Sequence, residues 1–286
     1  MFIPRKILED KLLQFLHEDV GQGDVTTAAV VPEELTVEAV VVAKDSGVIA
    51  GIDEASVLAE ALGLEGETYF LDGTEVKKGE TLLKLCGNAQ TILVAERTLL
   101  NLLSRMSGIA TKTRRIVQQL QGRKATSIVA ATRKSAPGLL YFDKKAVIVG
   151  GGDPHRLHLD DMVLIKDNHI VLAGDVASAI KKAKAGTSFT KKVEVEVTKS
   201  ADAVAAAKAG ADIVMLDNFN PAQARQAVSA LKRAGLRDKV ILEASGGISE
   251  ETLLDYASTG IDVLSLGELT HSVKAFNVSL EIIRVL

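Results

Sequence analysis

The pattern of apolar and polar positions changes partway along the chain, near residue 105. The first part is mixed: it combines helical spacing with the strict alternation that is typical of half-buried strands. In order, the pattern predicts a helix over 5–17, a Gly-rich loop, strands within 35–51, a helix over 54–63, and a hairpin over 69–87. Residues 1–105 are therefore predicted to form an amino-terminal β-sandwich domain of α+β type.

A long helix, or a pair of helices, is predicted over residues 90–120. Leu99 and Leu103 fall on one face, while Arg97 and Arg105 lie on another. By periodicity alone, the polar stripe indicates a helix face exposed to solvent.

From residue 125 onward, short β-branched apolar runs alternate with Ala-rich helical stretches. The runs lie at 126–132, 145–152, 161–168, 191–197, 211–218, 239–245 and 262–268, and helical stretches at 176–185, 200–210, 221–235 and 249–259. This alternation predicts a parallel sheet covered by helices, and its count and spacing favour a barrel of βα units. No Gly-x-Gly-x-x-Gly stretch opens a helix after the first run, which argues against a dinucleotide-binding fold.

Composition narrows the class of protein. Of the 286 residues, 47% are apolar but only 3% are aromatic, so the core must be mainly aliphatic. A net charge of −3 gives no global basic field for nucleic acid. No apolar run is long enough to span a bilayer, and the amino terminus reads as an amphipathic helix rather than a signal peptide. The single Cys86 is compatible with a reducing compartment, so we expect a cytoplasmic protein without a membrane or nucleic-acid partner.

Polar residues follow the apolar runs of the second part. They are Arg133 and Lys134, then Lys166, then Glu194 and Glu196, Asp217 and Asn218, Glu243 and Ser245, and finally Gly267 and Glu268. In a βα barrel the carboxyl ends of all strands meet at one rim. These side chains are therefore expected to face a common cavity.

The stretch "GGGDPHRLHLDDMVLIKDNH", at 150–169, concentrates positive charge. Three of the chain's five histidines, at 155, 158 and 169, lie there with Arg156 and Lys166. Together with Arg133 and Lys134 they predict a site for an anion that carries several charges. A zinc site is the competing interpretation, but no His-x-x-x-His or Cys partner supports it, and His158 is expected to be peripheral.

Two further features complete the predicted rim. Glu196 and Asp217 could hold Mg²⁺, which prefers oxygen ligands, or could instead pair with Lys166 or Lys134. The turns "ASGG" and "SLGE" lie where a phosphate is expected to bind backbone N–H groups in this architecture. The combination fits transfer chemistry between a phosphorylated sugar and a carboxylated acceptor.

Between about residues 17 and 273 the chain resembles the quinolinate phosphoribosyltransferase family. The resemblance is carried by "EDVGQGDVTT", "AERTLLNLLSRMSGIAT", "TRKSAPG", "GGGDPHRLHLDDMVLIKDNHI", "VEVEV", "VMLDN", "EASGGI" and "LGELTHS". It implies an amino-terminal sandwich domain and an open, seven-stranded α/β barrel over 106–270, and we expect a carboxyl-terminal helix, 271–286, packed on the sandwich. It also implies transfer of phosphoribosyl from phosphoribosyl pyrophosphate to quinolinate, giving nicotinate mononucleotide, pyrophosphate and CO2, with Mg²⁺, in NAD synthesis.

The resemblance also implies roles for individual residues. Quinolinate would bind Arg97, Thr132, Arg133, Lys134, His155, Arg156 and Lys166, with Arg97 donated by the neighbouring subunit of a homodimer or higher oligomer. Lys134, Glu196 and Asp217 would act in catalysis, the two acids near ribose and Mg²⁺, which they would hold directly or indirectly. Phosphate would bind Ser245, Gly246, Gly247, Leu266, Gly267, Glu268 and His271.

The chain departs from the usual family sequence at three positions, and three alternatives to the implied function stay open. Ser135, Leu140 and Pro154 stand where the family usually has Thr, Arg and Asn; Leu140 removes one cation, and Pro154 fixes the backbone before His155. The alternatives are a nicotinate phosphoribosyltransferase, a relative found with molybdate transport genes, and a non-catalytic binding protein of the same fold. Intact Glu196 and Asp217 argue against the last of these.

Overall fold

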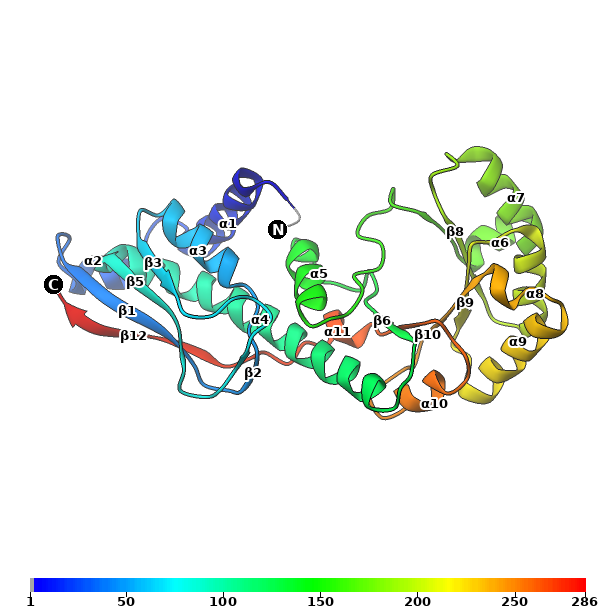
Figure 1. Ribbon diagram of the computed structural model, residues 1–286. Coiled ribbons are helices and arrows are strands. Elements are labelled where there is room, and N and C mark those ends of the chain that lie inside the picture. Colours follow the sequence, from blue (N-terminus) through cyan, green and yellow to red (C-terminus); the bar gives the residue numbers. More distant parts are fainter. Residues whose placement is uncertain (1–2) are drawn as a thin grey trace. The chain divides into compact units, whose positions relative to one another are not determined.

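The computed structural model describes residues 3–286, so the first two residues of the expected amino-terminal segment lie outside it. The chain forms two compact units, shown in Figure 1. The first contains the residues up to Arg114, Tyr141–Gly151 and Val273–Leu286, and the second contains Arg115–Leu140 and Gly152–Ser272. The change in sequence pattern near residue 105 lies within a helix of the first unit. The segment 141–151, from the middle of the chain, also belongs to that unit.

An antiparallel sheet forms the centre of the first unit, with strand order β12-β1-β5-β3. Its strands are β1 (Thr36–Ala43), β3 (Glu65–Thr68), β5 (Thr81–Asn88) and β12 (Val278–Val285), and a separate ribbon pairs β2 (Gly47–Val48) with β4 (Glu75–Val76). In β1, Val37, Ala39 and Val41 are buried while the residues between them are half-buried. This period of two places one face of the sheet against the core, as the alternation in the sequence predicted.

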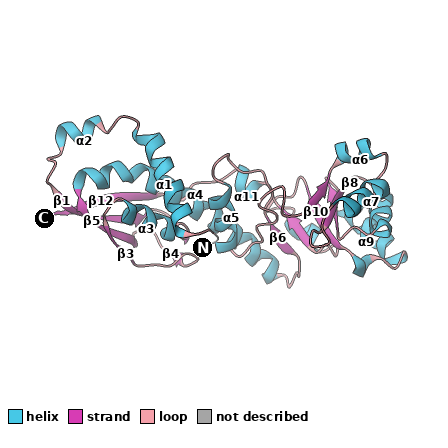
Figure 2. Cartoon of the chain, turned by 90° about the horizontal axis from the view of Figure 1, so that it is seen from above, coloured by secondary structure: helices cyan, strands magenta, loops and turns pink. Residues whose placement is uncertain are grey.

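Helices supply the rest of this core (Figure 2). They are α1 (Arg5–Val20), α2 (Val25–Val30), α3 (Ile52–Ala61), α4 (Ala89–Gly122) and α5 (Leu140–Val149). Leu8, Leu12 and Leu16 of α1 are buried at a spacing of four, and α1 packs against α3. The helix α2 begins within the predicted Gly-rich loop, because the Asp24 carboxylate accepts the N–H groups of its first turn.

The carboxyl-terminal segment is a strand, so the expected helix over 271–286 was wrong. A four-residue helix, α11 (Glu268–His271), ends there, and β12 then pairs antiparallel with β1, with Leu280 opposite Val41. The β-branched residues of "NVSLEIIRVL" favour a strand, and pairing satisfies the backbone of β1 along its length. The segment does belong to the first unit.

The apolar run at 145–152 is also not a strand, because it forms most of α5. A short apolar run cannot by itself distinguish a buried helix from a strand, and here buried charges decide the outcome. Asp143 accepts two hydrogen bonds from Arg105, at 2.7 and 2.9 Å, and Arg114 donates to the carbonyls that end the helix. Both arginines lie on α4, so α5 is fixed to the long helix by charged groups.

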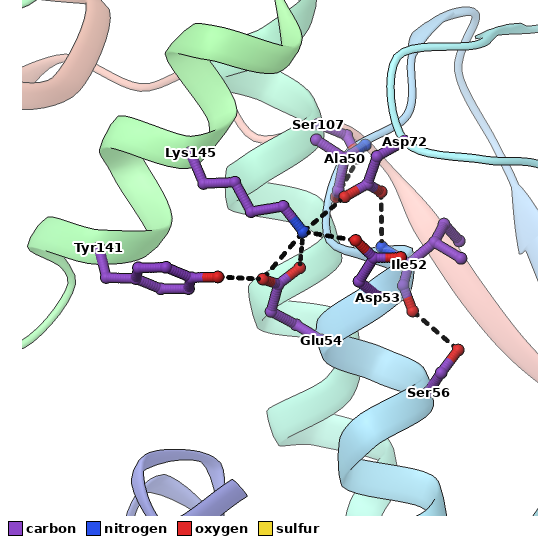
Figure 3. A network of polar contacts seen from close by, with 9 residues as sticks. All are labelled: Ala50, Ile52, Asp53, Glu54, Ser56, Asp72, Ser107, Tyr141 and Lys145. Atoms are coloured by element: carbon purple, nitrogen blue, oxygen red, sulfur yellow. Dashed lines mark hydrogen bonds and ion pairs between the residues drawn. The ribbon is translucent and has the colours of Figure 1, made fainter. Parts of the chain in front are cut away.

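A buried lysine anchors the same helix to α3 (Figure 3). The Nζ atom of Lys145 lies 2.8 Å from Glu54, 2.9 Å from Asp72 and 3.0 Å from Asp53, and Tyr141 donates to Glu54. Burial by itself would lower the pKa of Lys145, but the charges of Glu54 and Asp72 more than offset it, and the pKa is raised. The ammonium therefore stays charged among its carboxylates.

Replacing Lys145 with methionine is expected to destabilise the protein by about 3 kcal/mol, because the Glu54 carboxylate would be left buried without its counter-charge. Urea unfolding followed by circular dichroism measures the loss. Lys6→Met, which removes an exposed ion pair on α1, is the matched control and should leave the free energy of unfolding close to that of the wild type. Equal losses in the two variants would contradict a structural role for the buried network.

The second unit is built on a parallel sheet with strand order β6-β11-β10-β9-β8-β7. Its strands are β6 (Ile128–Ala130), β7 (Val163–Ile165), β8 (Val193–Val197), β9 (Ile213–Asp217), β10 (Ile241–Ser245) and β11 (Val263–Ser265). The first strand pairs with the last, and an isolated parallel bridge joins Ala130 to Asp153 on its other side. The Asp153 segment stands in the place of the seventh strand, and among the described residues no pairing joins it to β7.

Helices follow the strands of this sheet. They are α6 (Asp167–Ala173), α7 (Val176–Gly186), α8 (Ser200–Ala209), α9 (Pro221–Arg233), the short 3-10 helix η1 (Arg237–Lys239), α10 (Leu253–Ala257) and α11. In Figure 1, α7, α8 and α9 lie along the outer side of the sheet. In α9, Asn220 caps the amino end and Pro221 begins the first turn, while Ala224, Val228 and Leu231 are buried. In residues 3–286, no helix is both long and apolar enough to cross a membrane.

Candidate active site

The carboxyl ends of the parallel strands surround a cavity of about 530 Å³ in the second unit. This is a volume typical of small-molecule sites. The strand register places Asp217 of β9 directly beside Ser245 of β10. Of the residues predicted for the site, the cavity is lined by Thr132, Arg133, Lys134, His155, Arg156, Lys166, Glu196, Asp217, Ser245, Gly246 and Gly247.

Part of this lining is formed by the positively charged side chains of Arg133, Arg156 and Lys166. Burial and the charge of Arg133 both lower the pKa of Arg156, which nevertheless remains charged because of its high starting value. An adjoining cavity of about 590 Å³ is lined by Arg133, Arg156 and Lys166 as well. Cations held this close repel one another until an anion lies between them, so the arrangement favours an anionic ligand.

Two carboxylates face the same cavity from neighbouring strands. Lys166 forms an ion pair with Glu196 at 3.1 Å, which is one of the pairings that the sequence left open. Asp217 accepts a hydrogen bond from the Asn218 amide at 3.0 Å. Both acids are half-buried, and Lys166 is about half exposed, so its side chain has room to move away. Oxygen ligands at the edge of a cavity fit Mg²⁺.

The loop after β10 turns sharply where a phosphate was predicted. Gly246 and Gly247 have φ values of +88° and +65°, and Asn218 has +57°. The Asn218 N–H donates to the Ser245 carbonyl at 2.8 Å, which joins the two strand ends. A Cβ atom on Gly246 would lie 2.3 Å from the Asn218 side-chain oxygen, so only glycine fits there.

Gly246→Ala is therefore expected to displace Asn218 and disturb the loop. We expect a tenfold or greater rise in the half-saturation constant for a phosphorylated ligand, with the free energy of unfolding lowered by only about 1–2 kcal/mol. Gly235→Ala is the control: it also replaces a glycine with positive φ, +66°, but its Cβ would meet no atom within 4 Å. Equal effects of both variants on ligand binding would contradict the assignment.

The second predicted phosphate loop lies next to the cavity without lining it. Leu266 is fully buried, and a Cβ on Gly267 would contact the side chains of Lys134 and His271 at 3.0–3.2 Å. The Thr270 hydroxyl donates to the Lys134 carbonyl at 2.8 Å. This segment, which includes Glu268, therefore contacts the cation that lines the cavity.

His155 makes contacts through both of its ring nitrogens, whereas the sequence grouped it with the cations. The backbone N–H of Arg156 donates to His155 Nδ1 at 2.8 Å. The other ring nitrogen, Nε2, lies 3.1 Å from the Glu243 carboxylate. His155 thus contributes hydrogen bonding to the site from both ring nitrogens.

Two buried acids next to this ring were noted at strand ends in the sequence but were not assigned to the site. Glu243 lines the cavity, and Glu194 is completely buried, with carboxyl oxygens that have no hydrogen-bond partner among residues 3–286. Burial and the nearby charge of Glu243 raise the pKa of Glu194 to about 8. The sequence feature that could have identified these two acids is a carboxylate within an apolar run, as in "VEVEV" and "VILEAS".

The remaining predicted residues lie elsewhere. His158 is exposed, as expected for a peripheral residue, and His169 Nδ1 accepts the Lys166 N–H at the start of α6. Arg97 lies on α4 in the first unit, with its side chain 63% exposed and its nearest ion-pair contact Glu96 at 3.8 Å. The exposed position agrees with the stripe predicted from periodicity.

Comparison with known proteins places this arrangement in a family. The family model described as "Quinolinate phosphoribosyl transferase, C-terminal domain" matches residues 109–281, and the corresponding N-terminal domain model matches residues 24–107. Together the two models cover most of the chain.

Individual proteins agree with the family models. The chain is 46% identical over 273 residues to a Methanothermobacter thermautotrophicus protein named as a probable nicotinate-nucleotide pyrophosphorylase (carboxylating), covering 96% of this chain and 98% of that protein. It is 41% identical to the nicotinate-nucleotide pyrophosphorylase (carboxylating) of Mycobacterium leprae, covering 96% of each chain. The crystal structure of NadC from Streptococcus pyogenes is 36% identical, covers 100% of this chain and 99% of that one, and superposes with a TM-score of 0.91. On these matches and on the geometry of the cavity, the chain belongs to the quinolinate phosphoribosyltransferase family.

Proposed function

We propose that the protein transfers the phosphoribosyl group of phosphoribosyl pyrophosphate to quinolinate and releases CO2, giving nicotinate mononucleotide and pyrophosphate for NAD synthesis. The observation that carries the proposal is the cavity itself, whose lining combines the cations Arg133, Arg156 and Lys166 with the carboxylates Glu196 and Asp217. The family membership of the chain supports the same activity.

Quinolinate carries two carboxylates, and the cationic part of the lining suits them. A planar guanidinium can bind a carboxylate through two parallel hydrogen bonds, so Arg133 and Arg156 are each assigned to one carboxylate. The Thr132 hydroxyl and the His155 ring add hydrogen-bonding groups beside them. Binding places the pyridine nitrogen, which is itself the nucleophile, toward the sugar.

Departure of pyrophosphate leaves positive charge on C1 and the ring oxygen of the ribose. Glu196 and Asp217 both line the cavity, and we assign them to stabilise this charge. We assign Lys134 and Lys166 to the leaving pyrophosphate and the "SGG" turn at 245–247 to the 5′-phosphate, because all of these residues line the cavity. The segment at 266–271, which contacts Lys134 beside the cavity, is assigned to support the phosphate site. Glu196 and Asp217 would hold Mg²⁺, which neutralises charge on the pyrophosphate when bound.

Loss of CO2 follows from the alkylated ring. Once the bond between the nitrogen and C1 has formed, the cationic ring accepts the electron pair that the departing 2-carboxylate leaves on C2, and a proton then adds to C2. Cations that bind the 2-carboxylate too tightly would oppose this step.

One assay separates the proposal from its nearest rival. Purified protein is supplied with Mg²⁺, phosphoribosyl pyrophosphate and either quinolinate or nicotinate, and CO2 and mononucleotide are measured. We expect product and equimolar CO2 from quinolinate only. Product from nicotinate alone would indicate a nicotinate phosphoribosyltransferase, and ligand binding without product would indicate a non-catalytic binding protein.

The assembly and the compartment belong to the same proposal. The working unit is a homodimer or a higher oligomer in which Arg97 of one subunit completes the quinolinate site of the next. The long, exposed Arg97 side chain on α4 supports this assignment. The single cysteine supports a reducing cytoplasm as the place of action.

A further inference from the structure

Hydrogen bonds connect three segments of the second unit at the wall of the cavity. The Ser265 hydroxyl of β11 donates a short hydrogen bond to Glu243 Oε1 on β10. The other Glu243 oxygen lies 3.1 Å from Nε2 of His155, whose Nδ1 accepts the Arg156 N–H at 2.8 Å. Ser265 and Glu243 are almost completely buried, at 2% and 1% exposure. We name this set the Ser265–Glu243–His155 relay.

We propose that the relay is a positioning device: Ser265 and Glu243 fix the orientation of the His155 ring, and the ring fixes the backbone of Arg156 for binding a carboxylate of the substrate. The inference rests on the proposed function, because it is quinolinate that Arg156 is expected to bind. Ser265 and Glu243 thereby join the residues that determine substrate binding, although they act through another side chain.

The backbone at His155 has an unfavourable conformation that the relay helps to hold in place. Its φ of +54° lies in the left-handed region, which a residue with a Cβ adopts only when its surroundings hold it there. Asp153 holds the turn from one side by accepting the His155 N–H at 2.6 Å. The ring holds it from the other side by accepting the Arg156 N–H. A ring that rotated freely would release that amide and let the guanidinium move away from the cavity.

A metal ion is the competing occupant of this place. Ligand atoms of His155, Glu194 and Glu243 all lie within 4.8 Å of one another, as a divalent ion would require. The hydrogen bonds favour a proton on Nε2 of His155 over a metal ion bound to that nitrogen. A metal-bound histidine keeps a proton on its other nitrogen and donates with it, whereas Nδ1 of His155 accepts. Glu194 lies 3.6 Å from Nε2, beyond a normal hydrogen bond, so Glu243 is the partner of the ring.

The first test needs no turnover. Nitrogen-15 NMR of the histidine rings in the full-length protein should show His155, assigned by its loss in His155→Ala, as a neutral ring protonated on Nε2. Glu243→Gln, which keeps an acceptor oxygen, should preserve this tautomer, while Ser265→Ala and Glu243→Leu should give a mixture of tautomers. A proton on Nδ1 in the wild type would overturn the relay. So would a shift of the His155 nitrogens on addition of stoichiometric Zn²⁺ or Mn²⁺ that is lost in Glu243→Leu, since it would identify a metal site.

The second test asks whether the relay serves substrate binding. Ser265→Ala and Glu243→Leu should raise the half-saturation constant for quinolinate about tenfold and change that for phosphoribosyl pyrophosphate by less than about twofold. Glu243→Gln should recover most of the loss. Thr259→Val, which removes a buried hydroxyl donor outside the relay, should leave both constants unchanged.

A double-mutant cycle then separates positioning from direct contact. In a His155→Ala background, Ser265→Ala should cause no further loss, because the relay acts only through the ring. Independent losses that multiply, or equal losses for both substrates, would overturn the proposal. A wild-type protein without phosphoribosyl transfer would instead overturn the proposed function, and the NMR measurement would still decide the relay.

Discussion

Arg133→Ala is expected to weaken quinolinate binding roughly a hundredfold and phosphoribosyl pyrophosphate binding by less than about threefold. Arg133 lines both adjoining cavities, and its charge lowers the pKa of Arg156, so the two guanidinium groups share one anion site. Removing one partner of a charged, partly desolvated pair costs about 2–5 kcal/mol, which corresponds to this range of affinity. Calorimetric titration with each substrate separately measures the two losses.

The control for this variant is Arg233→Ala, which removes an exposed arginine near the end of α9, away from the cavity lining. It should bind both substrates as the wild type does. A similar loss of affinity for both substrates in Arg133→Ala would show that Arg133 supports the fold of the site or the phosphate groups. The carboxylate assignment would then have to pass to Arg156 and Lys166.

The sequence predicted the second unit well for a physical reason. A strand buried on both faces must be almost continuously apolar, so each polar residue after it marks the carboxyl end of the strand. That rule located Arg133, Lys166, Glu196 and Asp217, and the structure places all four in one cavity lining. The family membership is confirmed, and so is an α/β fold with a separate antiparallel amino-terminal sheet, although six strands of the described residues form the parallel sheet where seven were expected.

The errors arose where partners distant in sequence determine the structure. Nothing local shows that Asp143 and Lys145 are buried, because the groups that neutralise them lie 38 residues or more away in the chain. The strand β12 likewise depends on β1, more than 200 residues earlier. A pattern of neighbouring residues contains neither kind of information.

The contacts of His155 could not be predicted for the same reason. They depend on Glu243 of a distant strand and on a backbone turn with positive φ at the histidine itself. Residue type alone suggests a cation in a basic segment. The positions of the two ring nitrogens show which groups each of them contacts.

Two inactive variants are expected to restore activity to each other. If Arg97 of one subunit completes a site built around Arg133 of the next, Arg97→Ala and Arg133→Ala are each nearly inactive as pure proteins. A hybrid dimer of the two contains one site with both defects and one site with none. With random pairing half of the dimers are hybrids, so an equal mixture should recover about a quarter of wild-type activity. Differently tagged chains, exchanged by mild denaturation and purified on both tags, verify the hybrid.

The decisive control mixes wild-type chains with chains that carry both substitutions. If the site is shared, every hybrid has one defect in each of its two sites, and activity comes from wild-type dimers alone, about a quarter of that of the same amount of wild-type protein. If Arg97 and Arg133 serve the same site from one chain, the wild-type half of each hybrid stays active and the value doubles to about one half. In that case the mixture of single variants would also remain inactive. A shared site thus predicts about a quarter of wild-type activity for both mixtures. A site within one chain predicts no activity for the mixed single variants and about one half for the control mixture, whichever oligomer the dimers go on to form.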